Sequence, residues 1–188
     1  MSAPRPMRAD ARRNRARIVA VAREELAAHG GSFAMDTVAA RAGVGAGTLY
    51  RHFPTREALV ETVYAAELED LTTSSAALLD ALAPIAALRE WLTRYTQFAA
   101  TKRGMIDTLR AGTSESQAPM KATRERITTA VAPLLEAGVA DGSLRSDIRP
   151  DDVTVLLHGL FVATATRSDV EQIARLLDLV VDALRRRD

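Results

Sequence analysis

A cluster of hydrogen-bonding side chains stands in the first third of the sequence. Thr48, Tyr50, Arg51 and His52 fall close together, and Arg56 follows shortly after them. Hydroxyl, imidazole and guanidinium groups donate hydrogen bonds to phosphate oxygens, and contacts of this kind position a protein on a nucleic acid. The residue types therefore indicate binding to a phosphate backbone.

These side chains follow a glycine-rich turn. Residues 35–42 place small apolar groups on one side of a short helix, and residues 46–53 restart the chain as a second helix. Between and within them stand Gly43, Gly45 and Gly47. Each glycine costs about 1 kcal/mol relative to alanine in a helix interior. Three so close together indicate a sharp turn and a backbone that approaches another surface closely, so we predict a helix-turn-helix over about residues 34–53.

The stretch resembles the TetR-type one-component transcriptional regulators. The resemblance rests on residues 42–59, which read AGVGAGTLYRHFPTREAL, and on the long basic helix before them that ends at residues 28–31. It covers roughly residues 10–65, whereas the remainder matches the family only in length and helical character. The interpretation that competes with it is a helical hairpin buried in a core, with no role on DNA.

The whole chain of 188 residues has the pattern of an all-α protein. Apolar residues recur at helical spacing, and no alternating β-branched runs predict strands. We predict about nine helices, with a bend at residues 102–104 that separates two of them. Thr55 is expected to cap the fourth helix, and residues 141–143 to end a helix over about 118–140.

The predicted domains follow from these elements and the resemblance. Residues 1–9 are expected to form a flexible N-terminal arm, residues 10–65 the helix-turn-helix domain, and residues 66–188 a helical domain for effector binding and dimerisation. Residues 1–60 carry ten Lys and Arg against five Asp and Glu, although the whole chain has a net charge of only +1. A basic first part on a mildly acidic remainder fits a polyanion partner for that part alone.

Double-stranded DNA is the partner that the first domain is expected to bind. Thr48, Tyr50, His52 and Arg56 are assigned to phosphate oxygens, and the resemblance implies phosphate contacts for the tyrosine and histidine. The family usually has a lysine at the place of Arg56. Few side chains are candidates for contacts with base edges, and Arg41 is one of them. The predicted DNA-binding residues are Arg12, Arg13, Thr37, Ala46, Gly47, Thr48, Tyr50, Arg51, His52 and Arg56.

The second domain is expected to bind a small-molecule effector of unknown identity. In the family, such a ligand changes the separation of two DNA-binding heads and usually releases a repressor from its operator. The alternatives are a ligand-independent DNA-binding regulator and an architectural protein without an effector pocket. The residues predicted to line a pocket, which ordinary core packing would also explain, are Trp91, Tyr95, Phe98, Met105, His158 and Phe161.

The last two helices, over about residues 152–186, carry apolar groups on more of their circumference than one core face requires. Adjacent helices with this excess usually pack against a second copy. The resemblance implies the same arrangement, a four-helix interface, and we therefore predict a homodimer.

Other classes of function find little support in the sequence. The chain has no Cys and three His, none in a metal-ligand pattern, so we predict neither an enzyme nor a metal site, and no cofactor. No apolar run approaches the roughly 18 residues that a membrane span requires. The N-terminus lacks the apolar segment of a secretory signal, so we expect a cytoplasmic protein without a membrane partner.

Overall fold

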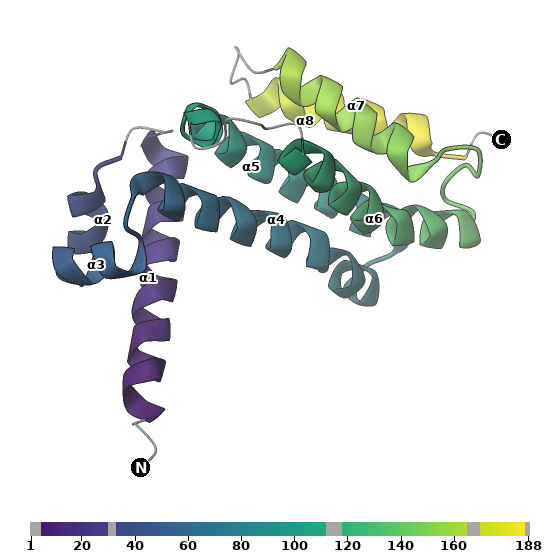
Figure 1. Cartoon of the computed structure of the whole chain (residues 1–188). Helices are drawn as coiled ribbons and strands as arrows, with labels where there is room; N and C mark the ends of the chain where they lie inside the picture. Colours follow the sequence, from purple (N-terminus) through teal and green to yellow (C-terminus); the bar gives the residue numbers. More distant parts are fainter. Residues whose placement is uncertain (1–4, 30–32, 112–117, 165–169, 187–188) are drawn as a thin grey trace. The chain divides into compact units, whose positions relative to one another are not determined.

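The computed structural model describes residues 5–29, 33–111, 118–164 and 170–186 (Figure 1). This part of the chain forms eight helices and no strand, which confirms the all-α prediction. The helices are α1 (Arg5–His29), α2 (Met35–Arg41), α3 (Ala46–His52), α4 (Arg56–Ala81), α5 (Pro84–Ala111), α6 (Ala118–Ala140), α7 (Pro150–Ala163) and α8 (Val170–Leu184).

Two helices are longer than the sequence predicted. Helix α1 begins at Arg5, so residues 5–9 of the expected arm are helical, and residues 1–4 lie outside the described residues. Pro6 is compatible with this start because the first turn of a helix makes no internal bond through its N–H groups. Helix α5 runs without a break through residues 102–104, where we expected a bend. Gly104 lies inside this helix, and a single glycine there costs only about 1 kcal/mol relative to alanine, which the rest of the helix can offset. Because α5 is one helix, the described part has eight helices instead of the nine that we predicted.

The chain divides into two compact units. The first unit comprises residues 1–66 and 100–114, and the second comprises residues 67–99 and 115–188. Helices α4 and α5 each begin in one unit and end in the other. The final turns of α5 therefore belong to the first unit, although the sequence assigned them to the second domain.

The first unit is organised around one apolar core. Helix α1 contributes Ile18, Ala22 and Leu26, and Met105 enters the same core from the end of α5. Nearby, burial lowers the pKa of Lys102, whose Nζ lies 5.8 Å from the centroid of the Tyr64 ring. The other buried members of this core are Phe33, Met35, Val38, Ala39, Ala42, Leu49, Phe53, Leu59, Val60 and Val63.

The second unit buries the only tryptophan of the chain. The indole of Trp91 donates a hydrogen bond of 3.1 Å from Nε1 to the backbone oxygen of Leu71. Its ring stacks on Tyr95 with 6.1 Å between centroids, and the Tyr95 and Phe98 centroids lie 6.3 Å apart. The hydrogen bond from Trp91 to Leu71 joins α5 to α4 within this unit.

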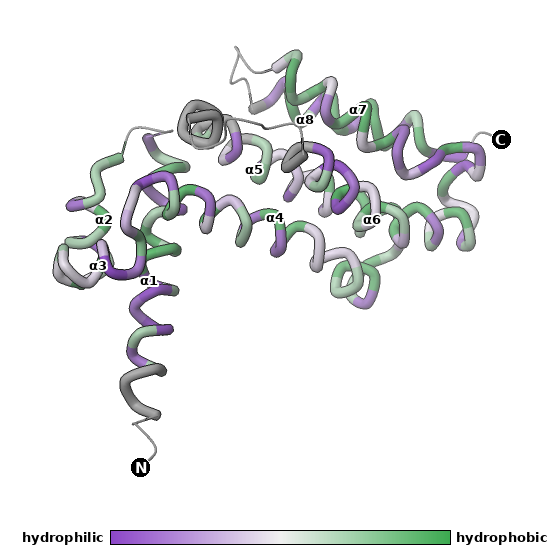
Figure 2. The backbone as a smooth tube through the Cα atoms, viewed as in Figure 1, coloured by the Kyte–Doolittle hydropathy of each residue, from purple (hydrophilic) through white to green (hydrophobic). Residues whose placement is uncertain are grey.

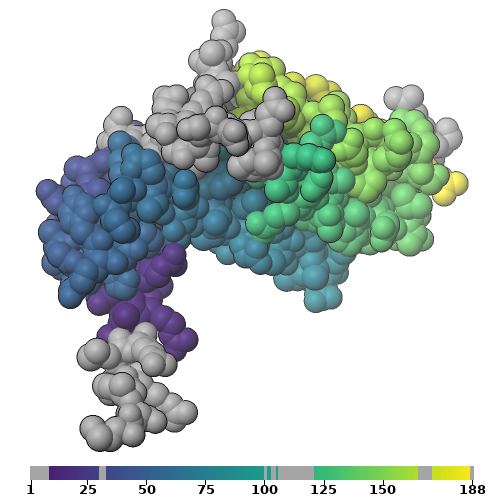
Figure 3. Space-filling view, in the orientation of Figure 1, coloured from purple at the N-terminus to yellow at the C-terminus, as the bar shows by residue number. Residues whose placement is uncertain are grey.

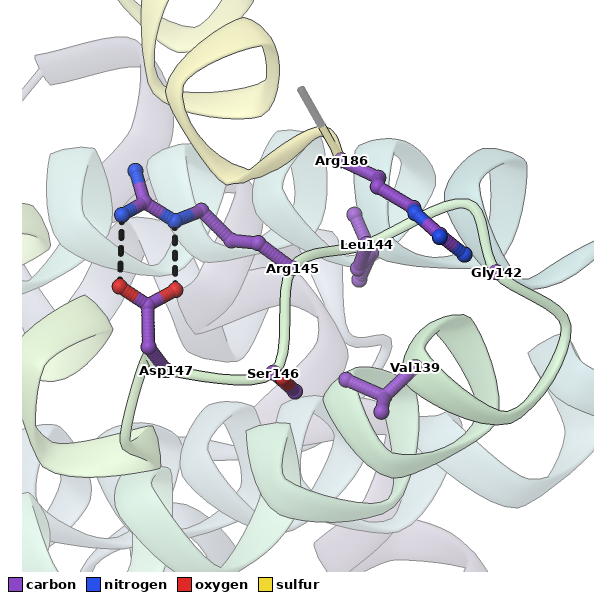
Figure 4. A pocket seen from close by; sticks show the side chains of 7 residues that line it. All are labelled: Val139, Gly142, Leu144, Arg145, Ser146, Asp147 and Arg186. Carbon is purple, nitrogen blue, oxygen red and sulfur yellow. Dashed lines mark hydrogen bonds and ion pairs between the residues drawn. The ribbon is translucent and has the colours of Figure 1, made fainter. Parts of the chain in front are cut away.

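The loop after α6 is held to the end of α8. Gly142 has a φ of +81°, which permits the turn that residues 141–143 were predicted to make. The N–H of Arg145 donates to the backbone oxygen of Leu184 at 3.0 Å. Figure 4 shows the shallow pocket beside this loop, with two hydrogen bonds of 2.6 Å between Arg145 and Asp147. This pairing raises the pKa of Arg145.

An apolar surface lies on the last two helices. Figure 2 shows hydrophobic residues along α7 and α8. Large apolar side chains on them are exposed, up to 64% for Leu179. The exposed members are Val155, Leu156, Val162 and Leu179.

Candidate nucleic-acid interface

The turn between α2 and α3 needs glycine at one position. Gly43 has a φ of +64°, and its N–H donates to the backbone oxygen of Ala40 at 3.1 Å. An L side chain rarely adopts this conformation, so glycine is required there for the fold. Gly45 and Gly47 have no positive φ, and a Cβ added to either would meet nothing within 4 Å. No contact within the described ranges explains these two glycines, which fits close approach by an external surface.

Helix α3 is fixed to the core by Leu49. This side chain is fully buried, whereas Ala46, Gly47 and Tyr50 are exposed. The backbone oxygen of Gly45 accepts hydrogen bonds from the first turn of α3, which defines where the helix begins. One anchored residue therefore holds a short helix whose opposite side faces away from the core.

Two of the predicted phosphate ligands, Tyr50 and His52, have no hydrogen-bond partner in the described part of the chain. Tyr50 is 46% exposed, and His52 is half-buried with its ring centroid 6.4 Å from that of Phe53. Among the described residues, no hydrogen bond or ion pair involves the side chain of either. Thr37, on α2, is also exposed. These side chains are free to bind groups outside the chain.

Arg51 folds back on its own helix. Its Nε donates to the backbone oxygen of Gly47 at 3.2 Å, and its Nη2 donates to the Thr48 hydroxyl at 2.9 Å. Both side chains were predicted to reach DNA. A base contact by Arg51 requires these two bonds to break, whereas the half-buried Thr48 hydroxyl is already held beside the start of α3.

Arg41 has a structural role instead of the predicted base contact. Its guanidinium forms ion pairs with Glu24, at 2.6 Å, and with the almost completely buried Glu25. The hydrogen bond that Arg41 donates to Glu25 raises the pKa of Arg41. A buried carboxylate that loses its partner is strongly destabilised, so this arginine holds α2 to α1.

The guanidinium of Arg56 packs against an aromatic ring, whereas we expected it to point outward toward a phosphate. Its Cζ lies 4.7 Å from the centroid of the Phe33 ring, in a cation–π arrangement. Its Nε and Nη2 are buried, with no hydrogen-bond partner in the part of the chain that the structure describes. A phosphate contact requires the guanidinium to turn outward from this position.

The first half of α1 carries four exposed arginines, Arg12, Arg13, Arg15 and Arg17. Figure 1 shows that the N-terminal end of this helix extends beyond α2 and α3. Arg13 is paired with Asp10, and Arg17 donates to Asn14 at 2.7 Å. No hydrogen bond or ion pair of Arg12 occurs within the described ranges. Of the two predicted DNA contacts on this helix, Arg12 is therefore the one without an internal partner.

Arg17 was not among the predicted DNA-binding residues. One of its guanidinium nitrogens lies 4.0 Å from the position that a Cβ on Gly43 would take, so it stands beside the helix-turn-helix turn. The cluster of arginines in this helix is a signal in the sequence, but it does not tell which member faces the turn. Arg15 points elsewhere, with its Cζ 5.2 Å from the centroid of the Phe53 ring.

The six residues predicted to line an effector pocket do not lie together. Trp91, Tyr95 and Phe98 form one buried aromatic cluster, and Phe161 is buried on α7 in the same unit. Met105 is part of the core of the first unit, because the end of α5 packs there.

His158 is exposed on α7, although the sequence favoured a core position. It lies one turn of helix from both Val155 and Val162, which are also exposed. In the described residues, no group of three or more His, Asp or Glu is placed to hold a metal ion. No described helix is both long and apolar enough to cross a membrane.

Two protein families match the chain, one in each part. The family described as "Bacterial regulatory proteins, tetR family" matches residues 18–63. The family described as "Transcriptional regulator SbtR-like, C-terminal domain" matches residues 83–186. None of the curated protein sequences compared with the chain matches it.

Two solved structures are similar over almost the whole chain. A TetR transcriptional regulator from Streptomyces coelicolor is 40% identical, with a TM-score of 0.82, and the match covers 93% of this chain and 99% of that one. A TetR transcription regulatory protein from Mycobacterium vanbaalenii is 33% identical, with a TM-score of 0.75 and coverage of 96% and 100%.

These similarities agree with the geometry of α2 and α3. The predictions of a helix-turn-helix fold and of a DNA-binding transcriptional regulator are confirmed, and the buried hairpin without a role on DNA is not favoured. The chain belongs to the TetR family of bacterial transcriptional regulators.

Proposed function

We propose that this protein is a cytoplasmic repressor that binds a palindromic or near-palindromic operator as a dimer and leaves it when a small molecule binds. The observation that carries the proposal is the surface of α3. There the side chains of Tyr50 and His52 have no hydrogen-bond partner among the residues that the structure describes, on a helix that Leu49 anchors to the core. Phosphate oxygens would accept hydrogen bonds from both side chains.

The dimer is proposed to form through α7 and α8. Their exposed apolar side chains would be covered by the same surface of a second copy in a two-fold interface. A dimer presents two recognition helices, which explains the expected symmetry of the operator. Leu156→Glu should give a monomer in analytical ultracentrifugation. Leu82→Glu, at an exposed apolar residue outside α7 and α8, is the matched control and should remain a dimer.

The experiment that tests the DNA-binding role uses DNA from upstream of the protein's own gene. Binding of the purified full-length protein is measured at two salt concentrations with competitor DNA present. We expect saturable binding that weakens steeply as salt rises, since phosphate contacts release counterions. No binding even at low salt would overturn the proposal.

Release by a ligand requires differential affinity. A small molecule shifts the protein away from DNA only if it binds the DNA-free conformation more tightly than the bound one. The repressor role is tested by transcription from the bound promoter in a reconstituted system. Addition of the protein should lower transcript yield, and higher yield would show an activator instead.

A further inference from the structure

A groove lies between the second half of α4 and α6, both within the second unit. The two helices run side by side in Figure 1, and Figure 3 shows their surfaces adjoining on the visible face. The groove has a volume of about 680 Å³, which is in the range of small-molecule sites. None of the residues predicted from the sequence to bind an effector lines it.

Direct contacts between the two helices fix the groove. The hydroxyl of Ser75 donates a hydrogen bond of 2.6 Å to the backbone oxygen of Ala130, and both residues are buried. At the same groove, Arg126 donates to the Thr72 hydroxyl at 3.2 Å and to the carboxylate of Glu69. The walls are therefore held in place before any ligand arrives.

The hydroxyl groups of the walls present hydrogen-bond acceptors. Thr72, Thr73 and Thr129 each donate their hydroxyl hydrogen to the backbone oxygen four residues earlier, at 2.8 to 2.9 Å. A hydroxyl has one hydrogen and two lone pairs. With the hydrogen used inside the helix, these groups offer oxygen lone pairs to a ligand.

Pro133 adds a further acceptor. Proline has no N–H, so the carbonyl of Thr129 lacks the bond that residue 133 would normally donate to it. Thr129 and Pro133 both line the groove, one helical turn apart.

The lining carries one carboxylate and one guanidinium, which differ in how closely they are paired. Glu125 is 66% exposed, and the Nζ of Lys121 is 3.9 Å from its carboxylate, at the limit of an ion pair. Arg126, the one cation in the lining, is paired with Glu69. The remaining surface is apolar, from Ala76, Ala122, Ala130 and the ring of Pro133.

We infer that this groove binds an amphipathic organic amine. The ammonium group donates hydrogen bonds to the Thr129 carbonyl and the Glu125 carboxylate, and the apolar body lies over the alanines and the proline ring. As the effector site of a repressor, the groove rests on the proposed function. It is suited to that role because α4, which forms one wall, begins at Arg56 directly after the helix-turn-helix.

Three matched probes test the class of ligand. Phenylbutylamine, phenylbutanol and phenylbutyrate share one apolar body and differ in the polar group. Calorimetric titration of the full chain should show saturable binding of the amine, weaker binding of the alcohol and none of the carboxylate. Equal binding of all three, or no binding of the amine at millimolar concentration, overturns the inference.

Two substitutions test whether the amine binds in the groove. Glu125→Gln removes the carboxylate, and Pro133→Ala returns an N–H to the Thr129 carbonyl without a risk to the helix, so each should weaken amine binding about tenfold. Glu136→Gln, an exposed residue of α6 outside the lining, is the control and should bind like the unaltered protein. Unchanged binding in both test variants overturns the assignment.

The same samples separate this inference from the proposed function. Operator binding is measured first without any amine. If the unaltered protein binds operator but not the amine, the groove assignment alone is overturned. Amine binding at the groove in a protein that binds no operator supports the groove and overturns the proposed function.

Discussion

The arginine side chains of the two units have different kinds of partners. In the second unit, all but one of the described arginines form an ion pair with a carboxylate, as in the bidentate contact of Arg124 with Asp151. The exception in the described part is Arg186. The paired arginines are Arg89, Arg94, Arg124, Arg126, Arg145, Arg149, Arg175 and Arg185.

In the first unit, Arg13 and Arg41 pair with carboxylates. Five other arginines contact hydroxyl groups, amides, backbone oxygens or aromatic rings, or have no internal contact. They are Arg12, Arg15, Arg17, Arg51 and Arg56. Exposed ion pairs add little to stability, but they cancel the field of each arginine. The unit in which several arginines contact groups other than carboxylates is the one expected to meet a polyanion.

The largest expected effect distinguishes the cores of the two units. Leu49→Ala should destabilise the first unit by about 2–5 kcal/mol, since it leaves a cavity at a fully buried site. Trp91 is the only tryptophan and lies in the second unit, so its fluorescence reports that unit. Denaturation followed by circular dichroism should show an early transition that tryptophan fluorescence does not follow.

Leu157→Ala, at a fully buried site of α7, is the matched control. It should shift the transition seen by tryptophan fluorescence to lower denaturant concentration and leave the stability of the first unit unchanged. If both variants moved both signals equally, the two units would unfold as one, and the comparison between them would lose its thermodynamic basis.

The next effect concerns the phosphate contacts of α3. Tyr50→Phe together with His52→Ala should weaken DNA binding at least tenfold, because a hydrogen bond to a charged group contributes roughly 1.5–3 kcal/mol. Operator and unrelated DNA should be affected alike, since phosphate contacts carry no sequence information. Fluorescence anisotropy with both DNAs measures this. Unchanged affinity in a salt titration would falsify the assignment of these two residues.

A smaller effect should separate paired from unpaired arginines. Arg12→Ala should reduce the slope of log K for DNA binding against log salt concentration by about one, the value expected for the loss of one phosphate contact. Arg13→Ala should change it less, because Asp10 already neutralises that side chain. Lys121→Ala, on the second unit, is the control and should leave the slope as it is. If all three variants reduced this slope equally, the salt dependence of DNA binding would reflect only the net charge of the protein.

The smallest effect is a pH dependence in the second unit. Hydrogen bonds from Ser143 lower the pKa of Asp141, so its contribution to stability is present above the ordinary carboxyl pKa and is lost as pH falls through the lowered one. Asp141→Ala should unfold at a slightly lower temperature near neutral pH, with a difference that disappears in acid. Asp80→Ala, at an exposed carboxylate of α4, should show no such trend.

Local signals in the sequence predicted local structure well. The hydroxyl of Thr55 accepts a hydrogen bond of 3.2 Å from the N–H of Ala58, as expected for the cap of α4. Helix α6 has the predicted bounds, and the positive φ of Gly142 follows it. These features depend on side-chain and backbone preferences within a few residues, which a sequence displays directly.

Predictions that required a partner elsewhere in the chain succeeded less often. Arg41 was one candidate for a base contact, and the sequence did not show that Glu25 on another helix holds it. Met105 and His158 were grouped with the aromatic cluster of the second unit, but the first lies in the other core and the second is exposed. Apolar spacing shows which face of a helix is buried but does not identify its neighbour.

The sequence by itself determined the helical class, the helix-turn-helix turn at Gly43 and the group of polar residues after it. Each follows from backbone conformation or from helical periodicity, which act over short stretches of chain. Only the tertiary structure decided which arginines keep a free charge, where the end of α5 packs and how α4 and α6 form a groove. Those outcomes depend on contacts between residues far apart in the sequence, such as Ser75 with Ala130.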